Sequence, residues 1–281
     1  MKKRIVIVGF FAALTMALVF HPLKLLISSA ERGDYYSHIP LIPLITAYLL
    51  YSERKRIFQN PGYGYFPGGI LILIGLLVRL TTEGLGLGLN ANDYTAIVVF
   101  SAILIFWGGF IIAFGTQAAR QAYFPLFFLL FLAPIPNLLM DYFISALQVG
   151  STEVSYLLFQ IIGVPIYREG FSFHLPGLSV EVAKQCSGIR SSLALVITVL
   201  IASHLFLRTA WRKWVLILAV FPITIIKNSI RILAITLLAA YVDMSFLTRG
   251  WLHQSGGILF FLPALFLLGG LLIALRKSEK G

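Results

Sequence analysis

Long apolar runs separated by short polar stretches dominate the pattern along the chain. They lie at about 5–29, 39–52, 67–82, 95–116, 122–137, 190–207, 214–241 and 256–275. A helix needs about 20 mostly apolar residues to cross a bilayer. The pattern therefore predicts an all-α polytopic membrane protein with about eight transmembrane helices. A further segment, 138–163, contains too many polar residues for a span that faces lipid.

Composition supports lipid as the main solvent. Only 12% of the 281 residues are charged and 59% are hydrophobic, whereas a soluble domain carries about 25% charged residues. Eight spans use most of this length, which excludes a large soluble domain. We therefore treat residues 1–281 as a single integral-membrane domain.

The basic residues indicate how the chain is oriented in the membrane. They number 22 against 11 acidic residues, and most gather in short clusters between apolar runs, which is a topology signal rather than a nucleic-acid footprint. Cytoplasmic loops are rich in Lys and Arg. The main clusters all lie on the inner side if 138–163 does not cross: Lys2–Arg4, Arg54–Arg56, Arg120, Arg208–Lys213 and Arg276–Lys280. This predicts both termini in the cytoplasm and an outer-face insertion at about 138–189.

The outer insertion combines two predicted elements. Segment 138–163 is expected to be a re-entrant or amphipathic helix on the outer side. In the residues that follow, Tyr167, Phe173 and Leu175 alternate with polar positions, and Glu169-Gly170 is typical of a turn. With another short strand at 178–182, the pattern predicts a small β-cap.

Three chemically reactive side chains are predicted to lie at the same depth. Cys186 precedes the span that descends from residue 190, and His253 precedes the last span. Arg231 lies 17 residues into the span that rises from Trp214. At 1.5 Å per residue, Arg231 is about 25 Å up a hydrocarbon core of about 30 Å. All three are therefore expected at the outer boundary.

These side chains suit nucleophilic acyl transfer. A thiol attacks as its thiolate, which a nearby cation favours. An imidazole exchanges protons near neutral pH, and an arginine stabilises a developing oxyanion. Each also has an ordinary alternative: Cys186 as a packing residue, His253 as an interfacial residue and Arg231 as an ion-pair partner. Because Cys186 is the single cysteine, it cannot form an intramolecular disulfide or a cysteine metal cluster.

Four ordered motifs resemble the exosortase/archaeosortase family. Residues 181–192, EVAKQCSGIRSS, are similar to its cysteine motif, and residues 222–232, PITIIKNSIRI, to its arginine motif. His253 falls where the third motif is expected, and residues 34–38, DYYSH, resemble the segment that opens the second span in bacterial members. The resemblance runs from about residue 30 to 260.

The resemblance implies a membrane-embedded cysteine protease or transpeptidase of the bacterial exosortase type. Its catalytic residues would be Cys186, Arg231 and His253, with no metal or organic cofactor. Its partners would be exported proteins with a C-terminal sorting signal, made of a short motif such as Pro-Glu-Pro, a helix and a basic tail. A surface glycan or amine is a possible acceptor. Lipid surrounds the enzyme in the inner membrane, and nucleic acid has no part.

Five further side chains are candidates for supporting or binding roles: Arg190, Asn228, Lys184, Lys227 and His38. The three cations suit an acidic sorting motif, but they equally suit snorkelling or topology. Asn228 lies three residues before Arg231 and can orient it, and His38 is either a site residue or an interfacial one. Two other functions stay open, namely a transporter that binds an anionic solute and an assembly factor for exopolysaccharide export.

Overall fold

The computed structural model describes residues 2–28, 36–84, 88–184, 188–248 and 251–279, without the side chains of 26–27, 247–248 and 251–258. Helices dominate it, as predicted. The chain divides into two compact units, Met1–Leu139 and Met140–Gly281. Each unit is described by itself below, and the expectation of a single domain over 1–281 stays a prediction.

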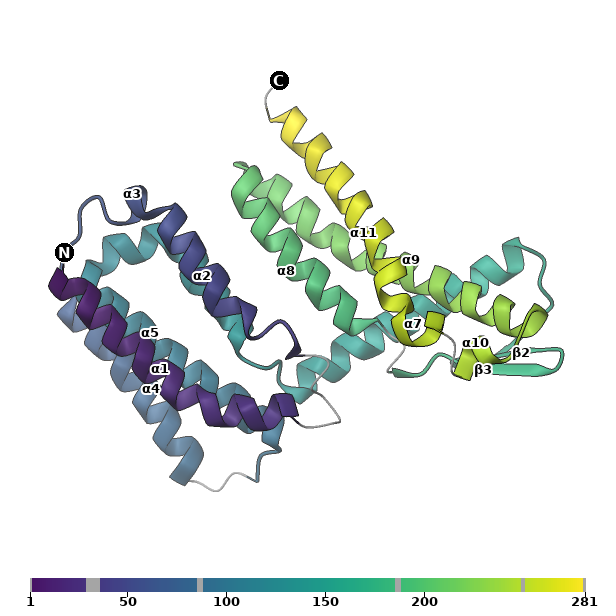
Figure 1. Ribbon diagram of the computed structural model, residues 1–281, viewed down its shortest axis with the longest axis horizontal. Helices are drawn as coiled ribbons and strands as arrows, with labels where there is room; N and C mark the ends of the chain where they lie inside the picture. Colours follow the sequence, from purple (N-terminus) through teal and green to yellow (C-terminus); the bar gives the residue numbers. More distant parts are fainter. Residues whose placement is uncertain (1, 29–35, 85–87, 185–187, 249–250, 280–281) are drawn as a thin grey trace. The chain divides into compact units, whose positions relative to one another are not determined.

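The first unit is built around one long, buried helix. Its elements are α1 (Lys2–Ser28), α2 (Leu41–Ser52), α3 (Arg54–Ile57), α4 (Tyr65–Gly84), α5 (Ala91–Gln121), α6 (Tyr123–Phe128) and the 3-10 helix η2 (Leu129–Leu132). Both α1 and α4 pack along α5 (Figure 1). Most of the apolar segment of α5 is buried inside the protein. Asn90 caps this helix, because its side-chain oxygen accepts from the backbone N–H of Asp93 at 2.9 Å.

Glycines let α4 and α5 approach very closely. A Cβ added at Gly68 would lie 2.6 Å from the carbonyl oxygen of Gly108, and one at Gly75 would lie 2.8 Å from that of Ser101. In lipid, the hydrophobic effect contributes little to helix association. Close van der Waals packing of backbones at small residues stabilises the helix pair instead. The glycine pattern of α4 therefore explains why these two helices pair.

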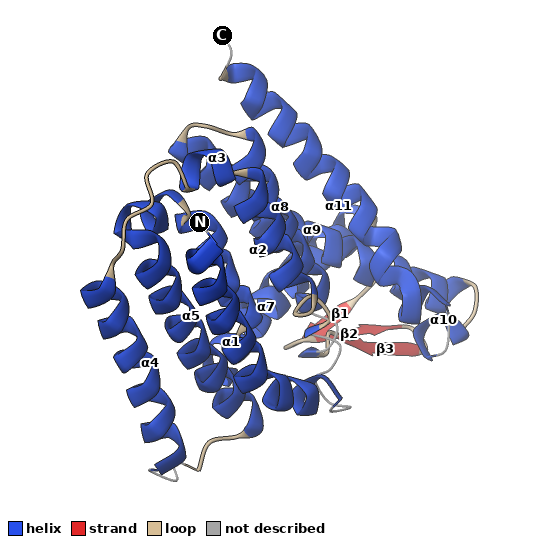
Figure 2. Ribbon diagram, turned by 60° about the vertical axis from the view of Figure 1, so that its left-hand side comes forward, coloured by secondary structure: helices blue, strands red, loops and turns tan. Residues whose placement is uncertain are grey.

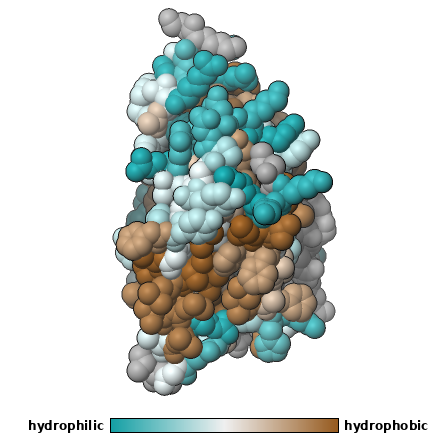
Figure 3. Space-filling model, turned by 90° about the vertical axis from the view of Figure 1, so that its left-hand side faces the viewer, coloured by the Kyte–Doolittle hydropathy of each residue, from teal (hydrophilic) through white to brown (hydrophobic). Residues whose placement is uncertain are grey.

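Apolar side chains cover the outside of the first unit. Phe66 and Leu80 of α4 are 81% and 62% exposed. Figure 3 shows one face of the protein, where hydrophobic side chains form a broad brown area with hydrophilic side chains above it and fewer below. Apolar patches of this extent are rare on soluble monomers. They are the expected surface of a protein surrounded by lipid.

The second unit contains three long helices that share an apolar core. Its helices are α7 (Asn137–Ile161, whose first three residues belong to the first unit), α8 (Ile189–Phe206), α9 (Ala210–Tyr241), α10 (Ser245–Thr248) and α11 (Trp251–Ser278). Buried residues of α8, α9 and α11 form one cluster: Leu195, Val199, Leu216, Val220, Ala264 and Leu268. This cluster packs the middle of α8 against the first half of α9.

A small antiparallel sheet confirms the predicted β-cap. Strands β1 (Tyr167–Glu169), β2 (Ser172–Leu175) and β3 (Leu178–Glu181) are neighbours in that order (Figure 2). The turn between β1 and β2 contains Gly170 with φ of 58°, a conformation that favours glycine. Phe173 of β2 is fully buried and contacts Phe159 of α7, with 5.3 Å between ring centroids.

An ion pair also fixes this sheet to α7. Arg168 donates from both terminal nitrogens to the two carboxylate oxygens of Glu153, at 2.8 and 2.6 Å. Such bidentate ion pairs fix the relative orientation of the two side chains as well as attracting them. The hydrogen bonds to Glu153 raise the pKa of Arg168 above its ordinary value. The sheet is thus held to α7 by an aromatic contact and a charged one.

The number of spans is lower than the apolar runs suggested. Among the described residues, six helices are long and apolar enough to cross a membrane, or seven if the bent pair Tyr123–Leu132 and Asn137–Ile161 forms one span. Helix α2 has only 12 residues, which reach about 18 Å at 1.5 Å per residue. The run at 122–137 becomes the short helices α6 and η2. The prediction of an all-α polytopic membrane protein is confirmed. The predicted number of eight spans agrees only roughly with these six or seven helices.

Glu279 binds the beginning of α9 from the end of α11. Its carboxylate accepts from the backbone N–H of Thr209 at 2.7 Å and from that of Arg208 at 3.0 Å, and Arg212 lies 3.6 Å away. These N–H groups of Thr209 and Arg208 lower the pKa of Glu279 from 4.5 to about 2. A carboxylate also interacts favourably with the positive end of a helix.

We therefore predict that Glu279→Gln lowers the thermal unfolding midpoint near neutral pH. The folded pKa lies below the unfolded one, so the stabilising effect of the carboxylate is complete above about pH 4.5 and is lost as the pH falls toward about 2. Thermal unfolding of both proteins in detergent, measured across this range, checks the prediction. Glu83→Gln, which removes only an exposed pair with Arg79, is the control. If the unfolding midpoint of wild type exceeded that of Glu279→Gln by the same amount at every pH, this result would contradict the charge-based explanation.

Candidate active site

Helix α9 carries three of the predicted site residues on neighbouring turns. Lys227 and Asn228 are buried, at 7% and 1% exposure, and Arg231 is partly buried. Residues four apart lie on the same helix face, so Arg231 follows Lys227 about 6 Å further along the axis. Charged and amide side chains inside an apolar helix are costly unless they have a partner or a function.

Gly188 brings the start of α8 against these side chains. Its φ of 77° lies in the left-handed region, where other residues are strained. A Cβ built at this glycine would lie 3.2 Å from the Asn228 side-chain oxygen and 3.7 Å from Lys227 Nζ. Glycine is therefore required here by backbone conformation and by the nearness of α9. The position is two residues after Cys186.

Serine side chains complete the contact between α8 and its neighbours. Lys227 donates a hydrogen bond from Nζ to Ser191 Oγ. Ser192 donates both its backbone N–H, at 3.0 Å, and its hydroxyl, at 2.8 Å, to the carbonyl of Gly188. The first turn of α8 is thus fixed by hydrogen bonds within itself and to α9.

Helix α7 supplies polar contacts from outside the sequence motifs. Asn228 donates from Nδ2 to Ser151 Oγ at 3.0 Å, and Ser229 donates to the carbonyl of Ser151 at 3.1 Å. Gln148 donates from Nε2 to the carbonyl of Val182 at 2.6 Å. Val182 comes four residues before Cys186. Helix α7 therefore holds both Asn228 and the chain that enters the cysteine segment.

The signal for these contacts was present in the sequence. The buried polar residues of α7 are Gln148, Ser151, Thr152 and Ser155, and this spacing of three or four places them on one helix face. From the sequence, the polar residues of 138–163 indicate a helix that does not face lipid and predict a re-entrant or amphipathic helix on the outer side. The structure shows that four of them face the protein interior instead.

The other predicted site residues lie in several places. Lys184 and Arg190 are exposed on either side of the cysteine segment. His38 is half-buried in the turn before α2 and belongs to the first unit, and its carbonyl accepts from the N–H of Leu41 at 3.0 Å. Cys186 lies outside the described residues. His253 is in the first turns of α11, and its side chain is not described. The meeting of Cys186, Arg231 and His253 stays a prediction.

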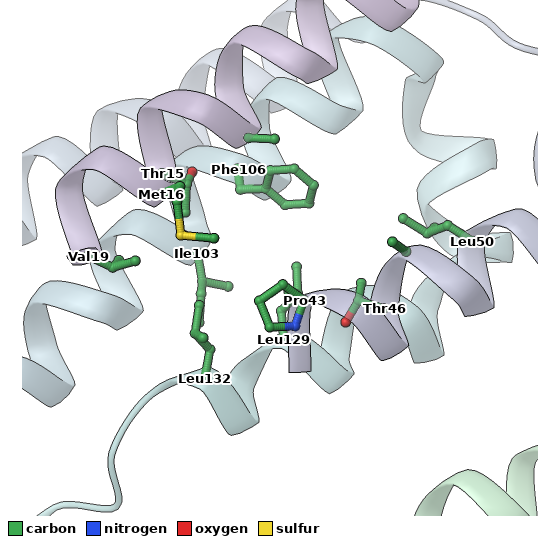
Figure 4. Close-up of a pocket in the computed structure, with 12 residues that line it drawn as sticks. Thr15, Met16, Val19, Pro43, Thr46, Leu50, Ile103, Phe106, Leu129 and Leu132 are labelled. Atoms are coloured by element: carbon green, nitrogen blue, oxygen red, sulfur yellow. The ribbon is translucent and has the colours of Figure 1, made fainter. Parts of the chain in front are cut away.

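A pocket of about 200 Å³ in the first unit has a different chemistry. Helices α1, α2, α5 and η2 line it, with Met16, Pro43 and Phe106 among the apolar side chains (Figure 4). Its polar side chains are only Thr15 and Thr46. With no ionisable group in its lining, this pocket cannot perform acyl transfer.

Comparison with known proteins agrees with the motifs. The model of one family, described as transmembrane exosortase, matches residues 30–270. Searches of curated proteins and of solved structures gave no match. The matched range includes the cysteine segment, the polar face of α7, the cations of α9 and the start of α11. This multi-pass membrane protein therefore belongs to the transmembrane exosortase family.

Proposed function

We propose that this protein is a cysteine endopeptidase or transpeptidase that cleaves the C-terminal sorting signals of exported proteins. One observation carries the proposal. The described residues that follow Cys186 pack directly on Lys227 and Asn228, within one helical turn of Arg231. The family processes sorting signals, and these residues are the ones that an acyl-transfer site at the outer face of the inner membrane would require.

The reaction would proceed in two steps. His253 takes the proton of the Cys186 thiol, and the thiolate adds to the scissile carbonyl. The resulting tetrahedral intermediate collapses, the C–N bond breaks, and His253 gives the proton to the leaving amine. The substrate is now a thioester on Cys186, and its C-terminal helix is released. Water, an amine or a glycan-linked acceptor then attacks this thioester and frees the thiol.

Arg231 would act on the charge that develops during both steps. A guanidinium stays protonated and offers several N–H donors in one plane. A site shielded from water strengthens its interaction with the tetrahedral oxyanion. Asn228 and Ser151 would keep α9 in place through their hydrogen bond at 3.0 Å.

A reporter protein tests this function directly. In a host without such an enzyme, an exported reporter that ends in a sorting motif, a helix and a basic tail should be shortened only when this protein is co-expressed. Mass spectrometry of the product locates the cut and shows hydrolysis or transfer. A reporter without the motif is the control and should stay intact. An uncut reporter, with the protein present in the membrane, would favour transport or an assembly role instead.

A further inference from the structure

Strand β3 is an outer strand of the small sheet, because the strands are ordered β1, β2, β3 (Figure 2). It pairs with β2 along Leu178–Glu181, and the next residue, Val182, donates its N–H to the carbonyl of Phe171 at 2.9 Å. Residues of an antiparallel strand alternate between those that bond to the neighbouring strand and those that do not. Because Val182 bonds toward β2, the backbone groups of Glu181 and Ser179 face away from it.

These outward backbone groups form an open edge. Ser179 and Glu181 are both exposed. The carbonyl of Glu181 accepts from the N–H of Ala183 at 3.0 Å. In the part of the chain that the structure describes, nothing bonds to the N–H of Glu181 or to the N–H and carbonyl of Ser179. These three groups are called the β3 edge below. An open strand edge is a template for another extended chain.

The β3 edge is held firmly by the helices behind the sheet. Leu178 of β3 is buried in an apolar cluster with Phe159 of α7 and Ile232 of α9. Just past the strand, the carbonyl of Val182 accepts from Gln148 of α7 at 2.6 Å. A binding surface that is already ordered loses little conformational entropy when a ligand binds, and this favours affinity.

The chain and its packing both place the β3 edge beside the proposed site. Glu181 precedes Cys186 by five residues, which span at most about 18 Å when extended. Ile232, in the cluster behind β3, directly follows Arg231. The sheet thus packs on the second half of α9, away from the basic residues at the beginning of that helix. The positive-inside rule predicts this to be the outer side, where an exported protein would meet the enzyme.

We propose that the β3 edge binds an extended segment of the exported substrate as an added strand. This inference rests on the proposed function and specifies how the substrate is recognised, namely by hydrogen bonds to its main chain near the scissile bond. An added strand binds through its backbone, and only its alternate residues bond to the edge. Three backbone groups, each contributing modestly, suit a substrate that must leave after reaction better than a permanent partner.

Backbone methylation of a peptide tests this pairing. Full-length Cys186→Ala protein, which cannot form a thioester, is titrated with soluble peptides that contain the sorting motif and its flanking residues, each with one N-methylated residue. We expect methylation to weaken binding by about 5–30-fold at alternate residues, for one or two lost backbone hydrogen bonds. The residues between them should change binding by less than about twofold, because their N–H groups face away from the edge.

A proline substitution in β3 tests the same contact from the protein side. Ser179→Pro removes an N–H that faces away from β2, a position where an edge strand tolerates proline, and leaves the bonds between β2 and β3 in place. We expect this variant to bind the unmethylated peptide about 5–30-fold more weakly and to lose the alternation. Ser179→Ala, which loses the same hydroxyl but keeps the N–H, should retain the alternation.

Several results would refute the pairing: no binding, equal sensitivity to methylation at all residues, or alternation that persists in folded Ser179→Pro. If thermal unfolding shows that Ser179→Pro does not fold, the methylated peptides alone decide. A wild-type dimer that Ser179→Pro converts to a monomer in light scattering would assign the edge to a second copy of the chain and overturn the proposal. Cleavage of the unmethylated peptide by wild type decides separately whether the proposed function stands.

Discussion

Arg231→Ala should reduce cleavage of a sorting-signal substrate by about 10²–10³-fold, the usual cost of losing one oxyanion donor. Cys186→Ala should abolish cleavage and sets the background, since no other thiol exists in the chain. Both proteins should still insert and accumulate. The rates are measured with purified protein and a sorting-signal peptide. Ile230→Ala, which changes the exposed apolar neighbour of Arg231, is the matched control and should stay near wild type.

Arg231→Lys distinguishes geometry from charge. Lysine keeps the positive charge but presents a compact ammonium instead of a planar set of donors. We therefore expect this variant to fail nearly as completely as Arg231→Ala. Full cleavage by Arg231→Lys would reduce the residue to a general source of positive potential. Equal rates for Arg231→Ala and wild type would remove it from the mechanism.

Local signals allowed the small sheet to be predicted from the sequence. Alternation at 167–175 and the turn at Glu169-Gly170 depend only on neighbouring residues, and β1 and β2 pair around that turn. Gly170 has a positive φ, which favours glycine, and a glycine at this position is itself a turn signal in the sequence. Features of this kind need no knowledge of distant contacts, which is why the expectation and the structure agree here.

Span lengths were harder to predict, because hydropathy counts apolar residues and not the path of the backbone. The run at 39–52 yields a helix of 12 residues, whose N-cap is Pro40. The run at 122–137 is interrupted: its 3-10 helix ends at Leu132, and Pro134 and Pro136 follow. A residue before proline is disfavoured in the helical conformation. The prolines are visible in the sequence, but hydropathy alone does not show where they end a helix.

The supporting residues of the site show a second limit. The sequence alone does not distinguish Lys184, Arg190 and Lys227 as candidate binding residues, since all three are cations in or near the cysteine or arginine motif. Only the structure separates them, because the burial of Lys227 depends on packing between α8 and α9. Ser151 illustrates the same point: its helical spacing was readable, but its bonds to Asn228 and Ser229 join residues 77 and 78 positions apart.

Replacing Cys186 and replacing His253, which exchange a proton in the proposed reaction, should impair cleavage in different ways. In Cys186→Ser, a hydroxyl replaces the thiol, and a much weaker acid must then be ionised to attack. The substrate should therefore bind without being cut and co-purify with the variant. Mass spectrometry of wild type should instead detect a substrate adduct on Cys186. Co-purification without an adduct in wild type would point to a non-covalent mechanism.

His253→Ala should retain slow cleavage. The thiol is still present, and in the proposed site the positive charge on α9 would favour its thiolate. General acid–base help is typically worth about 10²–10⁴-fold, so we expect a rate reduced by that factor but above the Cys186→Ala background. Without its base, the rate should rise with pH as more thiolate forms. A pH series with one peptide substrate measures this. Normal activity in His253→Ala, with a strong loss in His38→Ala or in a His174→Ala variant of strand β2, would show that another histidine transfers the proton.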